Sequence, residues 1–217
     1  MNPQSMKTQT RKDRLLNEAA KWRLISLLFD RPTEVWRKHV AELASSIGDE
    51  TLKLAAETAQ KEATEGLYHS IFGPGGPAPA REVSYCRLVQ LGQLLSELAG
   101  YYDAFAYSPH TSEVIDHVSV EAGFIGYLRL KEAYALDCGE TEHADVTAEA
   151  AERFLSEHLS RIAKPLADAL KESGSLYLAL AGSALLSRTG PPKDKPVRPG
   201  LPILQDSEDS SLHCGEI

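Results

Sequence analysis

The clearest amphipathic pattern in the chain is the stretch SYCRLVQLGQLLSELAGYYDAF, residues 84–105. Its apolar side chains recur at spacings of three and four, at Leu88, Leu91, Leu95, Leu98, Tyr102 and Phe105. This spacing places them on one face of an α-helix. The stretch therefore predicts a core helix and an α-helical fold.

Similar patterns predict helices on both sides of this stretch. Proline and glycine separate the patterns, because neither residue continues a helix well. Ala and Leu also far outnumber the β-branched residues, which favours helices over strands. We expect further helices over residues 11–29, 33–47, 49–70, 116–136, 147–172 and 176–186, with a kink at Pro165. The predicted fold is an all-α, single-domain bundle of about seven helices.

The two ends of the chain depart from this pattern. Residues 1–10 are polar and are predicted to form a disordered N-terminus, and the helical domain is expected to span residues 11–188. Residues 189–217 are rich in Pro, Ser and Asp, and include His213 and Cys214. We predict that they form an irregular C-terminal tail, mobile or lying along the surface.

Composition limits the classes of partner. The 217 residues contain 23 basic and 31 acidic side chains, a formal net charge of −8. Nucleic acid is a poor partner for such a chain, whereas a basic peptide suits it. No apolar run approaches the ~20 residues of a membrane-spanning helix, so we expect a cytoplasmic protein without stable membrane insertion. Three cysteines that lie far apart predict no disulfide framework.

Motifs of catalysis, nucleotide binding and metal binding are missing from the sequence. Glu140 and His143 have the spacing of a di-iron ligand pair, but they lie in a polar connection between predicted helices. We predict no enzymatic activity, no catalytic residue, no metal site and no cofactor. A metal-dependent enzyme on a helical bundle stays open as an alternative, with His143, Cys138 and nearby glutamates as ligands.

A polar group begins the predicted 116–136 helix. Asp116 has the side chain of a good N-cap, His117 would take the first helical position, and Glu121 lies one turn later on the same face. Such residues can bind the backbone of a ligand, or they can simply cap and solvate a helix end. Gly73, Gly75 and Gly76 predict a stiff turn between helices rather than a phosphate-binding loop.

Two segments carry a resemblance to a known family. The first is LYHSIFGPGGPAPAREVSY, residues 67–85, and the second is SEVIDHVSVE, residues 112–121. In their order they resemble the motifs of the TorD/DmsD/NarJ-type chaperones for molybdenum redox enzymes. The first is similar to that family's aromatic, Leu-Phe, Gly-Pro and Glu-x-x-Tyr elements, and the second to its Pro-x-Asp-His-(Ile/Leu)-x-x-Glu motif. Val114 stands where the second motif usually has a proline.

The resemblance implies a chaperone without catalytic activity that serves molybdoenzyme maturation, as in anaerobic respiration. Its partner would be the catalytic subunit of a molybdenum-dependent oxidoreductase. The chaperone would bind that subunit's N-terminal leader, often a twin-arginine signal peptide, and hold the subunit in the cytoplasm until its cofactors are inserted. A monomer or homodimer is expected. A structural subunit retained in a redox complex is a further alternative.

A leader that is basic at one end and apolar along its middle needs an acidic rim beside an exposed apolar groove. We predict that groove between the 73–80 turn and the start of the 116–136 helix. The predicted peptide-binding residues are Tyr68, Phe72, Gly73, Pro74, Glu82, Tyr85, Asp116, His117 and Glu121. The aromatic rings would offer apolar surface, the carboxylates would bind arginine, and His117 would donate to a peptide carbonyl. Phe72 and Tyr85 can equally well pack the turn against the bundle.

Overall fold

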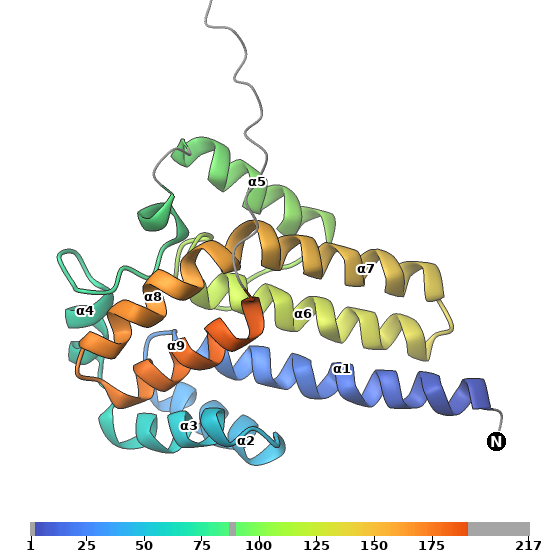
Figure 1. Ribbon diagram of the computed structural model, residues 1–217, viewed down its shortest axis with the longest axis horizontal. Coiled ribbons are helices and arrows are strands. Elements are labelled where there is room, and N and C mark those ends of the chain that lie inside the picture. Colours follow the sequence, from blue (N-terminus) through green and yellow to red (C-terminus); the bar gives the residue numbers. More distant parts are fainter. Residues whose placement is uncertain (1–2, 87–89, 191–217) are drawn as a thin grey trace, which may run out of the picture.

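The computed structural model describes residues 3–86 and 90–190, with side chains from residue 8 onward. These residues confirm the all-α fold, and their only β pairing is an isolated antiparallel bridge between Arg81 and His117. Figure 1 shows the α-helices, which are α1 (Pro3–Leu28), α2 (Glu34–Ser46), α3 (Glu50–Glu62), α4 (Glu65–Phe72), α5 (Leu91–Ala104), α6 (Val118–Asp137), α7 (Thr141–Phe154), α8 (Ser160–Glu172) and α9 (Leu176–Thr189). A 3-10 helix, Glu82–Tyr85, and a π-helix, Leu155–Leu159, complete the set.

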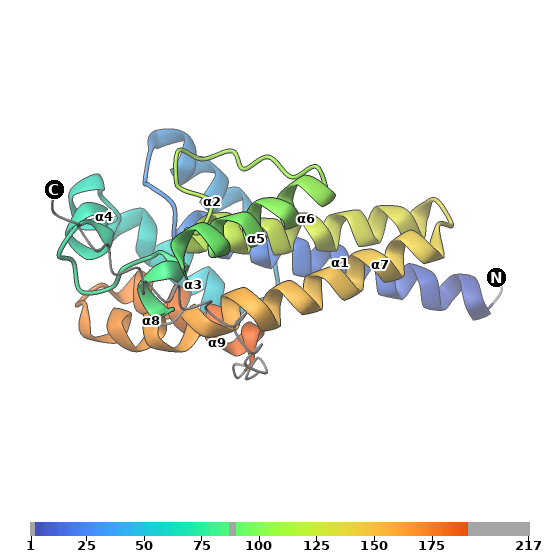
Figure 2. The same ribbon diagram turned by 90° about the horizontal axis from the view of Figure 1, so that it is seen from above.

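Three long helices run side by side along the length of the molecule. Helix α6 packs between α1 and α7, and both views of the ribbon show the three extending to one side. At the other end α9 packs against α3 and α8 (Figure 2). Within the described part of the chain, no helix is both long enough and apolar enough to cross a membrane.

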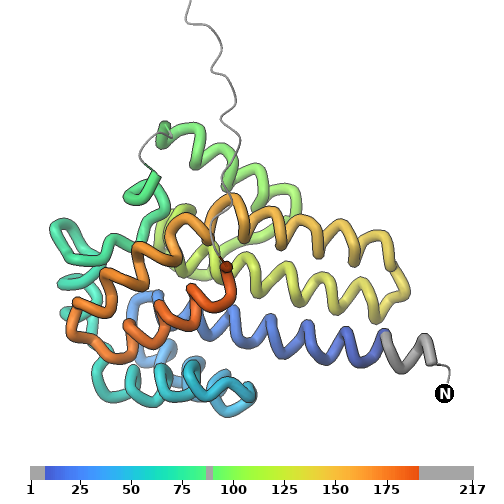
Figure 3. The backbone as a smooth tube through the Cα atoms, in the orientation of Figure 1, coloured from blue at the N-terminus to red at the C-terminus, as the bar shows by residue number. Residues whose placement is uncertain are grey.

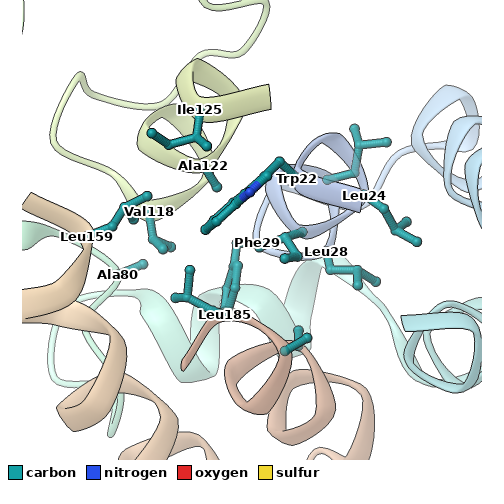
Figure 4. Close-up of a cluster of buried hydrophobic side chains, with 14 of the residues drawn as sticks. Trp22, Leu24, Leu28, Phe29, Ala80, Val118, Ala122, Ile125, Leu159 and Leu185 are labelled. Atoms are coloured by element: carbon teal, nitrogen blue, oxygen red, sulfur yellow. The ribbon is translucent and has the colours of Figure 1, made fainter. Parts of the chain in front are cut away.

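A main hydrophobic core joins these helices, and a second, smaller cluster of buried residues lies between α1, α6 and α7. Trp22 of α1 and Phe29, just after α1, meet Val118 and Ile125 of α6, and Leu185 of α9 closes the cluster from below (Figure 4). The last turns of α1 are buried on every side, since all residues from Leu24 to Phe29 lie in the interior. A helix of that kind has neighbours all round. The last turns of α1 therefore lie in the centre of the bundle.

The first half of the chain contains more helices than its apolar periodicity predicts, because side-chain caps start new ones. The predicted single helix over residues 49–70 is wrong, because the structure has α3 and α4 there. Ala63 leaves helical geometry, and the Thr64 hydroxyl accepts a hydrogen bond from the Leu67 amide at 3.1 Å. Thr33 and Asp49 cap α2 and α3 in the same way.

The predicted helix over residues 84–105 is also wrong in its first part. Residues 82–85 form the 3-10 helix, α5 begins only at Leu91, and Leu88 lies outside the described residues. The buried face of α5 consists of Leu94, Leu98 and Tyr102, whereas Leu91 is 45% exposed. Leucines lie on two neighbouring faces of this helix, one with Leu91 and Leu95 and one with Leu94 and Leu98. Spacing alone therefore did not determine which face packs against the core.

The helical run from Thr141 to Glu172 is irregular at a different place from the one predicted. Pro165 lies inside regular α8, and the irregularity is the π-helix before it, where the Ser160 amide donates to the Leu155 carbonyl. The backbone changes direction between α7 and α8 (Figure 3). At the N-terminus, α1 begins at Pro3, earlier than expected. The predicted tail, with His213 and Cys214, lies outside the described residues from position 191 onward.

Candidate functional site

The two segments that carry the resemblance lie against each other. The Glu82 amide donates to the Asp116 carbonyl at 2.8 Å, and the Val118 amide donates to the Ala80 carbonyl at 2.8 Å. These two hydrogen bonds form the antiparallel bridge between Arg81 and His117. The end of the 73–80 turn is thus fixed beside the start of α6, which is the neighbourhood expected for the site.

Glycine is required by the geometry of the turn. Gly75 has a φ of 79°, in the left-handed region that favours glycine. A Cβ at Gly76 would lie 2.3 Å from the Ile71 carbonyl oxygen, and one at Gly73 would lie 2.3 Å from the His69 carbonyl oxygen. The tip of the turn, including Pro74, is exposed.

A chain of polar contacts runs beneath this turn. The Tyr68 hydroxyl donates to Glu113 Oε1 at 2.8 Å and lies 3.3 Å from His117 Nε2. The Ser119 amide donates to His117 Nδ1 at 3.2 Å, so Nδ1 is an acceptor and Nε2 carries the proton. Burial lowers the pKa of His117 to about 4, which keeps the ring neutral at pH 7. Both ring nitrogens are therefore engaged within the protein.

Asp116 does not cap α6. The N-cap is His117, and α6 begins at Val118. The Asp116 carboxylate instead receives Arg81 Nε, at 2.9 Å from Oδ1 and 3.1 Å from Oδ2. Asp116 is fully buried, whereas the Arg81 side chain is 40% exposed. The arginine thus reaches a buried carboxylate from the surface.

Glu82 is a second buried carboxylate with partners from two other elements. Its Oε2 lies 3.0 Å from His158 Nδ1, in the π-helix, and its Oε1 lies 3.5 Å from Arg161 Nη1, in α8. The Cys86 thiol lies 3.8 Å from Oε1. Glu82 and His158 are fully buried, while Arg161 is 20% exposed. The wide turn of the π-helix includes the histidine that Glu82 contacts.

Glu121 is a third buried carboxyl group, in the first turn of α6. Neither of its oxygens has a hydrogen-bond partner among the described residues. Burial raises its pKa well above the usual range, and the nearby charges of Glu82 and Asp116 raise it further. A carboxyl group in this environment is held as the neutral acid.

The expected acidic rim is not on the surface in this conformation. Glu82, Asp116 and Glu121 each have no exposed surface. The partly or fully exposed members of the predicted set are Phe72, Gly73, Pro74 and Tyr85. The prediction of a solvent-facing carboxylate edge is therefore wrong for this state, although the predicted residues do gather in one region.

The aromatic members of the predicted set also hold the turn in place. The Phe72 ring packs 5.2 Å from the Tyr68 ring and 6.4 Å from the His117 ring, measured between centroids. The Tyr85 hydroxyl donates to the Pro79 carbonyl at 2.7 Å, and burial raises its pKa to about 12. Packing of the turn, the second role considered for Phe72 and Tyr85, is observed.

Sequence reasoning missed four members of this region: Arg81, Glu113, His158 and Arg161. One of them left a signal in the sequence. His158 lies four residues after Phe154 and three after Leu155, on the buried stripe of its helix. A polar side chain at a core-facing position is uncommon without a partner. No similar signal marks Arg81, because its role depends on which carboxylate the fold brings to it.

The residues considered as metal ligands do not assemble in the described part of the chain. His143 Nδ1 lies 2.9 Å from Glu140 Oε2 at the exposed start of α7, and Cys138 is exposed at the end of α6. The described residues contain no group of three or more His, Cys, Asp or Glu side chains that could hold a metal ion.

Comparison with known proteins adds no relative. No protein-family model matches the chain, and neither does any curated protein or any solved structure.

Proposed function

We propose that this protein is an assembly chaperone for a molybdenum-dependent oxidoreductase. In this proposal it binds the N-terminal leader of the catalytic subunit, of the twin-arginine type, in the cytoplasm and releases the subunit after cofactor insertion. The proposal rests on the two sequence motifs and on the all-α fold. The protein itself contributes no chemical step.

The observation that carries the proposal is the bridge between Arg81 and His117. It joins the two motifs, which are separate in sequence, and it places their carboxylates and aromatic rings in one region. Two motifs that share a binding task are expected to lie side by side in the fold. Their meeting supports a common binding site.

The exposed side of this region gives the leader a surface to contact. The turn presents Pro74 and Pro77 to solvent, and Phe72 and Tyr85 are partly exposed beside it. The apolar middle of a leader would pack on this side. Its basic end would be attracted by a chain whose formal charge is −8. We name the exposed turn and these two rings, residues 72–79 with Tyr85, the turn surface.

The proposal is tested by identifying the partner and then measuring binding of its leader. The protein should co-purify from its native cells with a molybdoenzyme catalytic subunit that still carries its leader and lacks its cofactor. A synthetic peptide of that leader should bind the purified protein. Substituting Pro77→Lys adds a positive charge to the turn surface and should weaken this binding by about tenfold or more.

Thr51→Lys is the matched control, because Thr51 is exposed on α3 and receives the same charge change. It should leave leader binding nearly unchanged. Equal binding by the wild type and Pro77→Lys would exclude the turn surface. Recovery of only the mature, cofactor-loaded enzyme would instead indicate a permanent subunit and reject the chaperone.

A further inference from the structure

A surface groove lies between α1 and α2, and none of its lining residues belongs to either motif. It has a volume of about 360 Å³ and is lined by Arg23 and Leu27 of α1 and by His39, Glu42 and Leu43 of α2. Small-molecule sites begin at roughly 300 Å³, so the size of this groove suits a small metabolite. We name it the α1–α2 groove.

The floor of the α1–α2 groove is apolar because of the spacing of residues on its two helices. Leu27 lies one turn after Arg23 on α1, and Leu43 lies one turn after His39 on α2. Leu27 is buried and Leu43 is half-buried. The Trp36 indole donates a hydrogen bond to the Leu27 carbonyl, which fixes α2 against α1 beside the groove. An apolar group of a ligand would lie on the two leucines.

The positive charge of the groove belongs to Arg23, whose side chain is partly exposed. Among the described residues its guanidinium group makes one side-chain hydrogen bond, from Nη1 to Ser26 Oγ, which is long at 3.4 Å, and no ion pair. A guanidinium group has five N–H donors in a planar fork that matches a carboxylate. Most of these donors are therefore available to an anionic ligand.

The negative charge of the groove belongs to Glu42, which is exposed on α2. Its carboxylate lies 3.8 Å from Lys38 Nζ, and both side chains are mostly exposed. Surface ion pairs of this kind contribute little free energy, so Glu42 can exchange this partner for a ligand. Within the described ranges Arg23 and Glu42 form no ion pair with each other, although they line the same groove. The space between the two charges is open to a ligand.

These features together select the chemistry of the ligand. A molecule that uses all of them has a carboxylate for Arg23, a cationic nitrogen for Glu42 and an apolar group for the leucine floor. A zwitterionic α-amino acid with an apolar side chain carries the three groups on one carbon atom. Glu42 would repel a phosphate group, and a simple fatty acid would leave Glu42 without a ligand group.

We propose that the α1–α2 groove binds a free α-amino acid with an apolar side chain. The guanidinium group of Arg23 binds the α-carboxylate, and the carboxylate of Glu42 binds the α-ammonium group. The ligand side chain packs on Leu27 and Leu43. This inference goes beyond the proposed function and does not rest on it, since the groove and the turn surface share no residue.

The first experiment compares ligands that lack one group at a time. L-leucine and L-phenylalanine are titrated to about 10 mM into 15N-labelled protein, and the amide signals of α1 and α2 are followed by NMR. Isocaproate is leucine without its ammonium group, isoamylamine is leucine without its carboxylate, and glycine lacks the apolar side chain. The better of the two amino acids should bind with a dissociation constant of about 0.1–1 mM, and each truncated ligand about tenfold more weakly. No saturable shift with either amino acid, or equal binding of the truncated ligands, would overturn the proposal.

The second experiment assigns each ligand group to one side chain. Glu42→Gln should weaken leucine binding by about tenfold and leave isocaproate binding unchanged, because isocaproate has no group for Glu42. Arg23→Gln should weaken leucine and isocaproate and leave isoamylamine unchanged. A purely structural disturbance would instead weaken all three ligands together, and that result in Glu42→Gln would overturn the proposal. Glu42 is exposed, so this variant should fold even if Arg23→Gln does not.

Glu57→Gln is the matched control, because it removes the same charge from an exposed position on α3. It should bind every ligand as the wild type does. The dipeptide Leu-Gly separates a free amino acid from the end of a polypeptide, since its carboxylate lies one residue farther from its ammonium group. It should bind about tenfold more weakly than leucine. Equal or tighter binding of Leu-Gly would assign the groove to the N-terminus of a polypeptide and reject the free amino acid.

Discussion

The polar residues of the site have charge states that are set by burial as much as by their partners. His117 is kept neutral because its ring is buried, and it relays a hydrogen bond from Ser119 toward Tyr68 and Glu113. Protonation of the ring would place a second donor at Nδ1, where the Ser119 amide already donates. Acid is therefore expected to weaken this part of the structure.

This leads to a prediction for the pH dependence of stability. The pKa of His117 is about 4 in the folded protein and about 6.5 when the ring is solvated. Between these values the unfolded chain binds the proton and the folded chain does not, so stability is lost as the pH falls from 6.5 toward 4. The loss from this one group is about 3 kcal/mol at most.

The measurement is urea unfolding of the wild type and His117→Gln at pH 7.5 and 4.5. The variant should lose less stability than the wild type on going to the lower pH, whatever its stability at the higher one. His39→Gln, in which an exposed ring on α2 is removed, controls for loss of a histidine. If all three proteins lose stability equally, His117 does not contribute this dependence.

At this scale the sequence predicted which residues gather but not what they contact. The structure places Asp116 and His117 beside the end of the turn, as the motifs predicted. The partners of these residues come from other elements and depend on tertiary packing, as Arg81 does for Asp116. The burial of Glu121 was readable in part, since it lies three residues after Val118 and four before Ile125, on the core-facing stripe.

Among the helices, the contact between α1 and α6 depends on a residue without a side chain, Gly126. A Cβ on Gly126 would lie 3.2 Å from the Ala19 carbonyl oxygen and 3.3 Å from the Arg23 amide nitrogen. Both atoms belong to the backbone of α1, so they cannot turn aside as a flexible side chain does. The two helices approach each other as closely as they do because this position has no side chain.

Gly126→Ala should therefore separate α1 from α6 slightly and destabilise the protein by about 1–3 kcal/mol. The matched variant is Gly100→Ala on α5, where a Cβ would meet nothing within 4 Å. That variant should stabilise the protein by about 0.5–1 kcal/mol, because alanine favours the helix. Thermal or urea unfolding measures both effects, and a Gly126→Ala protein as stable as the wild type would show that the helices can adjust.

The sequence predicted which regions are helical, but it predicted the ends of the helices less well. Apolar spacing identified every long helical region, but it did not identify the break at Thr64, which depends on one side-chain cap. It also did not identify the π-helix, because the extra residue of a wide turn leaves no proline or glycine to mark it. Local hydrogen bonds decided these features, and periodicity does not report them.

The whole molecule carries an excess of acidic groups, with a formal charge of −8. If the proposed function holds, this field would attract a basic leader during its approach, before any contact forms. The short-range contacts of a bound leader would be screened much less by salt. Approach and retention should therefore respond differently to ionic strength.

Stopped-flow or surface-based kinetics with a leader peptide that contains an Arg-Arg pair can measure this difference. Raising the sodium chloride concentration from about 20 mM to about 500 mM should lower the association rate constant by about tenfold, with little change in the dissociation rate constant. A salt effect confined to dissociation would contradict attraction of the leader by the charge of the protein. A neutral peptide of equal length serves as the reference.

The bridge between Arg81 and His117 also affects how freely the chain between them can change in length. Its two hydrogen bonds close a ring of chain that contains α5, with both ends of the ring held at one place. The entropy of closing such a ring grows only with the logarithm of its length, so doubling it adds roughly 0.6 kcal/mol. Insertions and deletions inside the ring therefore change the free energy of closing it only slightly, and they leave the two hydrogen bonds at its ends intact. We therefore expect the number of residues between the two motifs to be less constrained than the pairing of their ends.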